Sequence, residues 1–386
     1  MTRISVLLPT RQGESLLGVC LDAVLAEDDP DIELVVSDNA NSDATPEILA
    51  ARAGDPRLKV VRQDRVLSVT DNWNAAWASC TGDYAVLIGD DDLLLPGYFA
   101  RLRRLLAESG EPECLTYSCY AFVMPSAIAG LDRAHYADPH FRIETDLLAA
   151  RRLDAGQRAG IVADMFRFRP RLPLNLQSTV FARTAAERLP RGLFRAPFPD
   201  HYALNGMLMT AESWACVPDQ LAVIGVSPKS FGHYSFSGET ERGLAYLDSD
   251  IGFPGRLPGN ELLTAMYRWL LLLQDDFPQA AGLRISRGDY VVRQAWDWLR
   301  AWRLGSLDAR GVLANLALLD PRDWLLGLRL VADPEIIAAA GARLRLRGDQ
   351  RADHVWLGLR PAPDGVESMS EFAAWVTGYP EASSSA

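Results

Sequence analysis

Short runs rich in β-branched and apolar residues alternate with stretches of helical periodicity through the first half of the chain. The first run covers residues 4–8. Residues 14–27 follow it and place apolar side chains at i, i+4, i+7 and i+8 counted from Leu17, on one face of a helix. This alternation is typical of βαβ units around a mostly parallel sheet.

The pattern continues along the chain. Further strands are predicted at residues 32–36, 58–61, 84–88 and 115–123, and further helices at residues 45–54, at residues 69–80 and from Pro96 onward. In open α/β sheets, ligands bind beyond the carboxyl ends of the strands. We therefore expect the residues that follow the first, second and fourth strands to converge on one crevice.

The second half of the chain is less regular. Residues 124–173 contain scattered Pro, His and Arg and are interpreted as a variable insertion, after which residues 174–183 resume the strand pattern. Beyond about residue 258 the periodicity is helical. The sequence thus predicts an α/β domain over residues 1–257 and an appended α-helical region over residues 258–386, with a frayed tail at residues 381–386.

The composition is that of a globular protein, with 48% hydrophobic and 23% charged residues among 386. A formal net charge of -11 argues against a nucleic-acid partner, which clustered Lys and Arg would hold. The start lacks the pattern of a signal peptide, and no apolar run reaches the roughly 18 residues that span a bilayer. The expectation is a cytoplasmic protein without a transmembrane segment. The five scattered cysteines favour free, buried thiols.

An aspartate run, Asp90, Asp91 and Asp92, directly follows the fourth predicted strand. Three neighbouring carboxylates are difficult to ionise together without a cation or several hydrogen bonds nearby. Because Mg²⁺ and Mn²⁺ bind carboxylate and phosphate oxygens together, the run predicts a divalent metal shared with a nucleotide diphosphate. The structural alternative is an acidic loop that favours the N-terminal end of the helix after Pro96.

A second polar turn, residues 37–45, follows the second predicted strand. Its short polar side chains are of the kind that hydrogen-bond either to neighbouring backbone or to a ligand. Asp38 lies at the carboxyl end of the strand, and we expect it to contact a ligand. Asp43 and Thr45 are instead expected to cap the next helix.

These motifs together resemble family 2 glycosyltransferases of the GT-A fold, in order across residues 3 to about 106. The resemblance rests on the opening Val-Leu-Leu-Pro-Thr that ends at Thr10, on the Ser-Asp-Asn that contains Asp38 with its following Asn-Ser-Asp-x-Thr, on Asn74 before Gly-Asp-Tyr, and on the aspartate run four residues before Pro96. It implies a GT-A, Rossmann-like sheet with a nucleotide-sugar-binding half over residues 1–123 and an acceptor-binding half over residues 124–257.

The resemblance implies roles on the donor side. Thr10 and Asp38 would line the nucleoside pocket, and Arg65 would contact the base or diphosphate, although a solvated surface arginine is an equal alternative. Asp92 would be the main metal ligand, with Asp90 on the ribose or phosphate side as well as near the metal and Asp91 in support. The common family pattern has an aspartate where this chain has Gly89, which weakens the ribose assignment.

The resemblance also implies a catalytic base. Asp200, in Phe-Pro-Asp-His-Tyr, would remove the proton of the acceptor hydroxyl during an inverting transfer, and its alternative is a helix N-cap. His201 is a rival base, but neighbouring residues of a helix point about 100° apart, so only one should face the cleft. His233 would complete the metal site, against a purely structural role.

Other nucleotide-binding classes lack their motifs in this chain. A sugar-phosphate nucleotidyltransferase is expected to carry a Gly-rich basic loop after the first strand, where this chain has a single glycine. The fingerprints G-x-G-x-x-G and GxxxxGK[ST] do not occur there either. A non-catalytic, glycosyltransferase-like binding or assembly protein is the alternative from another class.

The acceptor cannot be identified from the sequence beyond a saccharide, a lipid-linked molecule or another hydroxyl compound. The apolar stretch at residues 262–273 is interpreted as a buried core helix. Peripheral contact with the inner face of a membrane and a homodimer through the helical C-terminal region are the two other interpretations.

Overall fold

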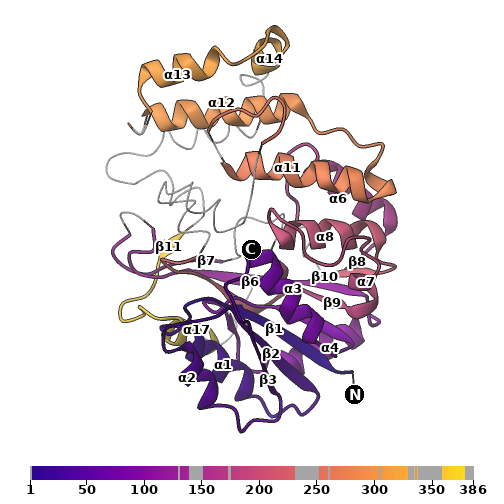
Figure 1. The fold of residues 1–386 in the computed structure, drawn as a ribbon, viewed down its shortest axis with the longest axis vertical. Coiled ribbons are helices and arrows are strands. Elements are labelled where there is room, and N and C mark those ends of the chain that lie inside the picture. The colour runs from indigo at the N-terminus through magenta and orange to yellow at the C-terminus, as the bar shows by residue number, and fades with distance from the viewer. Residues whose placement is uncertain are drawn as a thin grey trace, which may run out of the picture.

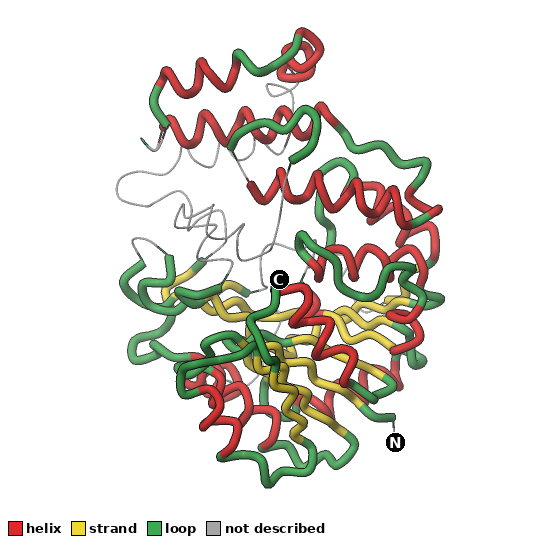
Figure 2. Tube along the Cα trace, in the orientation of Figure 1, coloured by secondary structure: helices red, strands yellow, loops and turns green. Residues whose placement is uncertain are grey.

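The structure is a computed structural model of the chain, and it describes residues 2–128, 131–138, 151–172, 175–230, 252–259, 261–303, 305, 307–328, 334, 337 and 359–378. One large sheet lies between helices, and further helices extend away from one of its faces (Figure 1). Coloured by secondary structure, the strands form a continuous band that helices flank (Figure 2). The predicted α/β architecture is confirmed.

The strands have the following bounds: β1 Ile4–Thr10, β2 Ile32–Asp38, β3 Leu58–Arg62, β4 Tyr84–Leu87, β5 Leu93–Leu94, β6 Cys114–Val123, β7 His135–Ala137, β8 Arg151–Leu153, β9 Thr179–Ala182, β10 Trp214–Val226 and β11 Arg360–Pro361. Their order is β11-β7-β6-β9-β4-β1-β2-β3, with β10 beside β6, β5 and β8. The pairs β1–β2, β1–β4 and β2–β3 are parallel. Beyond β4 the sheet is mixed, because β9 runs antiparallel to both β4 and β6.

The helices have the following bounds: α1 Leu17–Leu25, α2 Thr45–Ala50, α3 Val69–Ser79, α4 Tyr98–Glu108, α6 Ala155–Met165, α7 Arg183–Glu187, α8 Pro199–Thr210, α11 Glu261–Asp276, α12 Arg287–Arg303, α13 Ala309–Leu316, α14 Pro321–Gly327 and α17 Met369–Gly378, with the 3-10 turns η2 Leu176–Ser178 and η3 Pro278–Ala280. Ser68 caps α3 by accepting from Asp71 N–H. Gly97 precedes α4 at a φ of 79°, a left-handed conformation that glycine adopts without strain.

The sheet is buried on both faces, which explains why its first strands are apolar on successive positions. Leu7 packs in one core cluster with residues of α3, α8 and α11. Its neighbours Val6 and Leu8 point the other way and pack with residues of α1 and α4. Each face of β1 is therefore covered, and only its carboxyl end is left for a polar site.

The C-terminal region differs in one respect from the prediction of helices alone. α11 packs on α8, α12 packs on α11, and α13 and α14 pack on α12, so these helices extend outward from the sheet (Figure 1). The chain then returns, because β11 pairs with β7 and Phe372 of α17 packs against Tyr120 and Phe122 of β6. The two-residue length of β11 left no periodic signal in the sequence.

The apolar stretch at residues 262–273 lies in α11 and is largely core. Thr264, Met266, Trp269 and Leu273 are buried. This agrees with the buried-helix interpretation of that stretch. Within the described residues, none of the helices combines the length and the apolar character that crossing a membrane requires.

Candidate functional site

The aspartate run forms the turn between β4 and β5, and Asp92 holds that turn in place. Its Oδ2 accepts from the backbone N–H of Gly89 at 2.6 Å and from Nε2 of Gln177 at 3.0 Å. Its Oδ1 accepts from the N–H of Gly225 in β10 at 3.0 Å. Gly225 has to be glycine, because a Cβ there would overlap the carbonyl oxygen of Asp91. Asp92 is only 2% exposed, so its carboxylate is a buried anchor.

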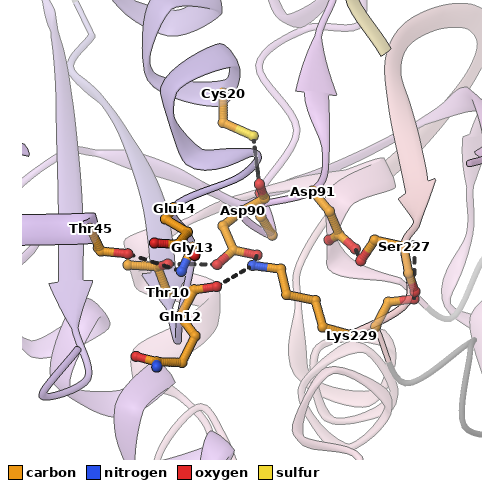
Figure 3. A network of polar contacts seen from close by, with 12 residues as sticks. Thr10, Gln12, Gly13, Glu14, Cys20, Thr45, Asp90, Asp91, Ser227 and Lys229 are labelled. Atoms are coloured by element: carbon orange, nitrogen blue, oxygen red, sulfur yellow. Dashed lines mark hydrogen bonds and ion pairs between the residues drawn. The ribbon is translucent and has the colours of Figure 1, made fainter. Parts of the chain in front are cut away.

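The other two carboxylates of the run, those of Asp90 and Asp91, contact side chains at the end of β1 and just after β10 (Figure 3). Thr10, the last residue of β1, donates its hydroxyl to Asp90 Oδ2 at 2.6 Å, and Lys229 Nζ lies 3.0 Å from Asp90 Oδ1. The Ser227 hydroxyl, just after β10, donates to Asp91 Oδ2 at 2.6 Å. The structure therefore brings Thr10 and all three aspartates together, as the topology predicted.

Cys20 of α1 also contacts the backbone of this turn. Its thiol donates to the carbonyl oxygens of Asp90 at 3.1 Å and of Asp92 at 2.7 Å. Burial, reinforced by the aspartates, raises the pKa of this thiol well above its ordinary value. The thiol consequently stays protonated and acts as a donor to the turn rather than as a nucleophile.

Burial and mutual repulsion disfavour the ionised forms of Asp91 and Asp92. Burial, followed by the charges of Asp92 and Asp90, raises the pKa of Asp91 to about 8, while Ser227 and Lys229 oppose the rise. Burial also raises the pKa of Asp92, against the three N–H groups that it accepts from. A cation close to the turn would reverse these shifts, because it favours the ionised form of each carboxylate.

Asp38 ends β2 directly beside Thr10, with which it is in register. Its Oδ2 accepts from Nη1 of Arg62 at 2.5 Å, and its Oδ1 accepts from the N–H of Asn41 at 3.0 Å. Asn41 Oδ1 in turn accepts from the N–H of Gln12 at 2.7 Å. The polar loops after β1 and β2 are thus tied together at the sheet edge where the aspartate run lies.

The expected capping of α2 by Thr45 is wrong. The N-cap residue is Ala44, which provides no side-chain cap. Thr45 Oγ1 instead accepts from the N–H of Gly13 at 2.9 Å, and Asp43 Oδ2 accepts from the N–H of Glu14 at 3.0 Å. Both side chains satisfy donors of the loop after β1, a partner that local helix signals do not reveal. Asp43 Oδ1 also accepts from the N–H of Thr45, the first residue of α2, at 3.2 Å, so Asp43 does satisfy a donor at the start of that helix, as expected.

The fit of a divalent metal to these residues can be judged from their oxygens. Carboxylates are the ligands that Mg²⁺ and Mn²⁺ prefer. Among the described residues, no three His, Cys, Asp or Glu side chains are placed to hold an ion by themselves. A metal at this turn would therefore share its ligands with a bound diphosphate. The oxygens of Asp92 already accept three N–H bonds, whereas the hydrogen bond to Asp91 comes from one hydroxyl.

Asp200 lies in the first turn of α8, which begins at Pro199 with Phe198 as its N-cap residue, so Asp200 is not the N-cap. Its Oδ1 accepts from the N–H of His201 at 2.9 Å. Burial raises the pKa of Asp200 and lowers that of His201. The His201 ring stacks on Phe198 and meets the edge of Trp269. His201 is therefore packed as a core residue.

The segment η2 connects α8 to the aspartate run. Gln177 of η2 donates to Asp92, and η2 itself packs against α8. Leu176 of η2 belongs to the same core cluster as Phe198. The start of α8 is consequently positioned relative to the turn through one short, buried segment.

Arg65 is not drawn into this cluster. Arg65 lies exposed in the loop between β3 and α3. His233 lies outside the described residues.

Sequence reasoning missed several residues of the site: Gln12, Cys20, Arg62, Gln177, Gly225, Ser227 and Lys229. Of these residues, only Lys229 could have been singled out from the sequence, because it is one of only two lysines in the chain.

The fold and the site together define a GT-A domain, an α/β domain with a polar, acidic turn at the carboxyl ends of its parallel strands. The sequence model described as Glycosyl transferase family 2 matches residues 5–141. Residues 5–141 therefore match a family 2 glycosyltransferase domain, and the resemblance found in the sequence is confirmed over that part of the chain.

Two curated relatives share part of this domain. A GalNAc(5)-diNAcBac-PP-undecaprenol beta-1,3-glucosyltransferase of Campylobacter jejuni is 29% identical over 104 residues, which are 26% of this chain and 34% of that protein. The succinoglycan biosynthesis protein ExoO of Rhizobium meliloti is 31% identical over 86 residues, which are 22% of this chain and 24% of that protein. The chain thus spans about a third or less of the relatives it matches.

Among solved structures, S. aureus TarS 1-349 in complex with UDP-GlcNAc resembles this chain with a TM-score of 0.50 and 12% sequence identity. The match covers 78% of this chain and 73% of TarS 1-349. At this identity the likeness concerns the fold alone, and it extends well beyond residue 141, the end of the family match.

Proposed function

We propose that this chain is an inverting glycosyltransferase that moves a sugar from a nucleotide-diphosphate sugar to an acceptor hydroxyl, in the assembly of a polysaccharide, glycolipid or other glycoconjugate. The observation that carries the proposal is the convergence of Thr10, Asp38 and the aspartate run at one sheet edge of a family 2 domain. Ligands of open α/β sheets bind at such an edge.

On the donor side, Thr10 and Asp38 would line the nucleoside pocket, with Arg65 near the base or diphosphate and Asp90 near the ribose or phosphate. A bound Mn²⁺ or Mg²⁺ would neutralise the departing diphosphate. Asp92, Asp90 and His233 were the predicted ligands. We propose that Asp91 joins them as the principal one, because Asp92 is committed to three N–H donors, whereas Asp91 accepts from the hydroxyl of Ser227.

On the acceptor side, Asp200 would act as the base. Its carboxylate takes the proton of the acceptor hydroxyl while that oxygen forms a bond to the anomeric carbon. The bond between the anomeric carbon and the diphosphate oxygen breaks on the opposite face, and its electron pair leaves with the nucleoside diphosphate. A single displacement of this kind inverts the anomeric configuration.

A panel of nucleotide sugars tests the proposal by thermal shift. UDP-glucose, UDP-GlcNAc, GDP-mannose and dTDP-glucose would each be added with and without Mn²⁺. A donor that binds only the folded protein stabilises it by about 2.7 kcal/mol at a hundred times its Kd, so one donor is expected to raise Tm, and to do so more strongly with Mn²⁺. If every donor in the panel leaves Tm unchanged, a non-catalytic binding or assembly role replaces the enzyme.

We also propose that the protein lies peripherally at the cytoplasmic face of a membrane, where it would meet a lipid-linked acceptor. Large apolar side chains are exposed on α12, α13 and α14 and on residues that directly follow α13 and α14, namely Leu299, Trp302, Leu313, Leu318, Trp324, Leu325 and Leu328. Exposed arginines accompany them at positions 303, 310 and 322. Apolar surface with basic residues around it is the combination that binds anionic lipid.

Vesicle sedimentation tests the membrane contact. The chain is expected to pellet with vesicles that contain phosphatidylglycerol, and Trp324→Ser with Leu325→Ser is expected to weaken this binding about tenfold. Val66→Ser, a change at another exposed apolar residue in the loop before α3, serves as the matched control. Equal pelleting of the double variant would contradict the proposal. A concentration-dependent dimer that the double variant loses would assign this surface to self-association instead.

A further inference from the structure

The ammonium group of Lys229 connects three segments at the centre of the candidate donor site (Figure 3). Nζ lies 3.0 Å from Asp90 Oδ1 and donates to the backbone carbonyl of Gln12 at 3.1 Å. Lys229 follows the end of β10, Asp90 follows β4, and Gln12 follows β1. The side chain is 29% exposed, so the protein covers it only in part.

A short turn fixes the backbone that carries Lys229. The N–H of Ser230 donates to the carbonyl of Ser227 at 3.1 Å, and the Ser230 hydroxyl accepts from the N–H of Ser227 at 3.2 Å. Ser227 is itself bound to Asp91. The turn is therefore anchored to the aspartate run, and the position of Lys229 beside Asp90 follows from the same anchoring.

The residue type at position 229 stands out against the rest of the chain. Only two of the 39 basic residues are lysines, and the other, Lys59, donates to a backbone carbonyl at the protein surface. Arginine therefore supplies nearly all positive charge elsewhere. A lysine ammonium is a compact point charge with three donors, whereas a guanidinium is a planar fork that suits different partners. The site thus has the cation that fits between one carboxylate oxygen and one carbonyl.

We propose that Lys229 is a cationic contact for the diphosphate of the donor, an inference that rests on the proposed glycosyltransferase function. The ammonium keeps its bond to Asp90 or Gln12 and directs a remaining N–H to a diphosphate oxygen. When the bond from the anomeric carbon to the diphosphate breaks, the electron pair stays on the diphosphate oxygen, and Lys229 stabilises that charge without giving up its proton. Asp200 receives the acceptor proton, so charge and protons balance.

Nucleotide binding to the full chain in EDTA tests this inference apart from turnover. UDP, GDP, ADP and dTDP are the probes, and the nucleoside of whichever diphosphate binds is the reference ligand. Lys229→Met is expected to weaken diphosphate binding about tenfold or more, because a charge-assisted hydrogen bond is lost, and to leave nucleoside binding unchanged. The wild-type affinity should also fall more steeply with salt than that of the variant. Lys229→Arg should recover part of the affinity.

Lys59→Met is the control, since it removes the other lysine of the chain at a surface position. Unchanged diphosphate affinity in a folded Lys229→Met variant would overturn the role of Lys229 and leave the proposed function standing. Tighter binding in that variant would also overturn it and would identify Lys229 as a group that the donor has to displace. If the wild-type chain binds none of the four diphosphates, either in EDTA or with Mn²⁺, the inference falls together with the proposed function.

Discussion

Asp91→Asn is expected to slow sugar transfer strongly and, at the same time, to make the metal-free protein more stable at neutral pH. The folded-state pKa of Asp91, about 8, lies above the ordinary value of 3.8. Between these values the folded state binds more protons than the unfolded state, so the contribution of this carboxyl to stability falls as pH rises from about 4 to 8. Asparagine keeps the shape of the side chain and an oxygen that accepts from the Ser227 hydroxyl, but it cannot ionise. The loss of stability between pH 4 and 8 is therefore absent in the variant.

Three measurements follow for this variant. Turnover should fall by about 10² to 10³, as happens when one group that stabilises the transition-state charge is removed. The free energy of unfolding at pH 7 without metal should rise by on the order of 1 kcal/mol. Mn²⁺ should raise the Tm of the wild type but not that of the variant.

Asp219→Asn is the matched control for Asp91→Asn. Asp219 is an aspartate of β10 that pairs with Arg101 away from the aspartate run. This control should keep its turnover and its response to Mn²⁺. A folded Asp91→Asn variant that retains both would show that Asp91 is not the metal-binding carboxylate, and Asp92 or Asp90 would have to be reconsidered.

The sequence located the site because its positions are set by local signals. Thr10, Asp38 and the aspartate run each lie at or just after the carboxyl end of a strand that is recognisable from its apolar residues. The parallel order of β4, β1 and β2 brings these strand ends together. A rule about strand ends is enough to predict this convergence. The same reasoning placed Asp200 at the start of a helix, which the structure begins one residue earlier at Pro199.

The different hydrogen-bond partners of the three aspartates could not be predicted in the same way. The partners that hydrogen-bond to the Asp92 carboxylate include Gly225 and Gln177, which lie 133 and 85 residues away in the sequence. Lys229 and Ser227 reach the run only because β10 lies parallel to β6 and antiparallel to β5. Local patterns carry no information about such pairings, because strand order is settled by packing of the whole sheet. Adjacent aspartates therefore look equivalent in the sequence but have different partners in the fold.

Asp200→Asn is the second change with a large expected effect. A positioned general base contributes about 10² to 10⁴ to a reaction rate, so kcat should fall by that factor. The Kd of the donor should stay unchanged, because the contacts that hold the aspartate run come from Gly89, Gln177 and Gly225 rather than from α8. Asparagine retains an oxygen for the N–H of His201, so the start of α8 is expected to stay folded.

The pH dependence gives this prediction a second readout. A base acts only when it is deprotonated, and burial raises the pKa of Asp200 above its ordinary value of 3.8. Wild-type kcat is therefore expected to fall as pH drops through that raised pKa, and the residual rate of Asp200→Asn should lack this acidic limb. His201→Gln tests the neighbouring rival and should keep the limb, because His201 packs between Phe198 and Trp269. If the limb disappears in His201→Gln and persists in Asp200→Asn, the histidine is the base.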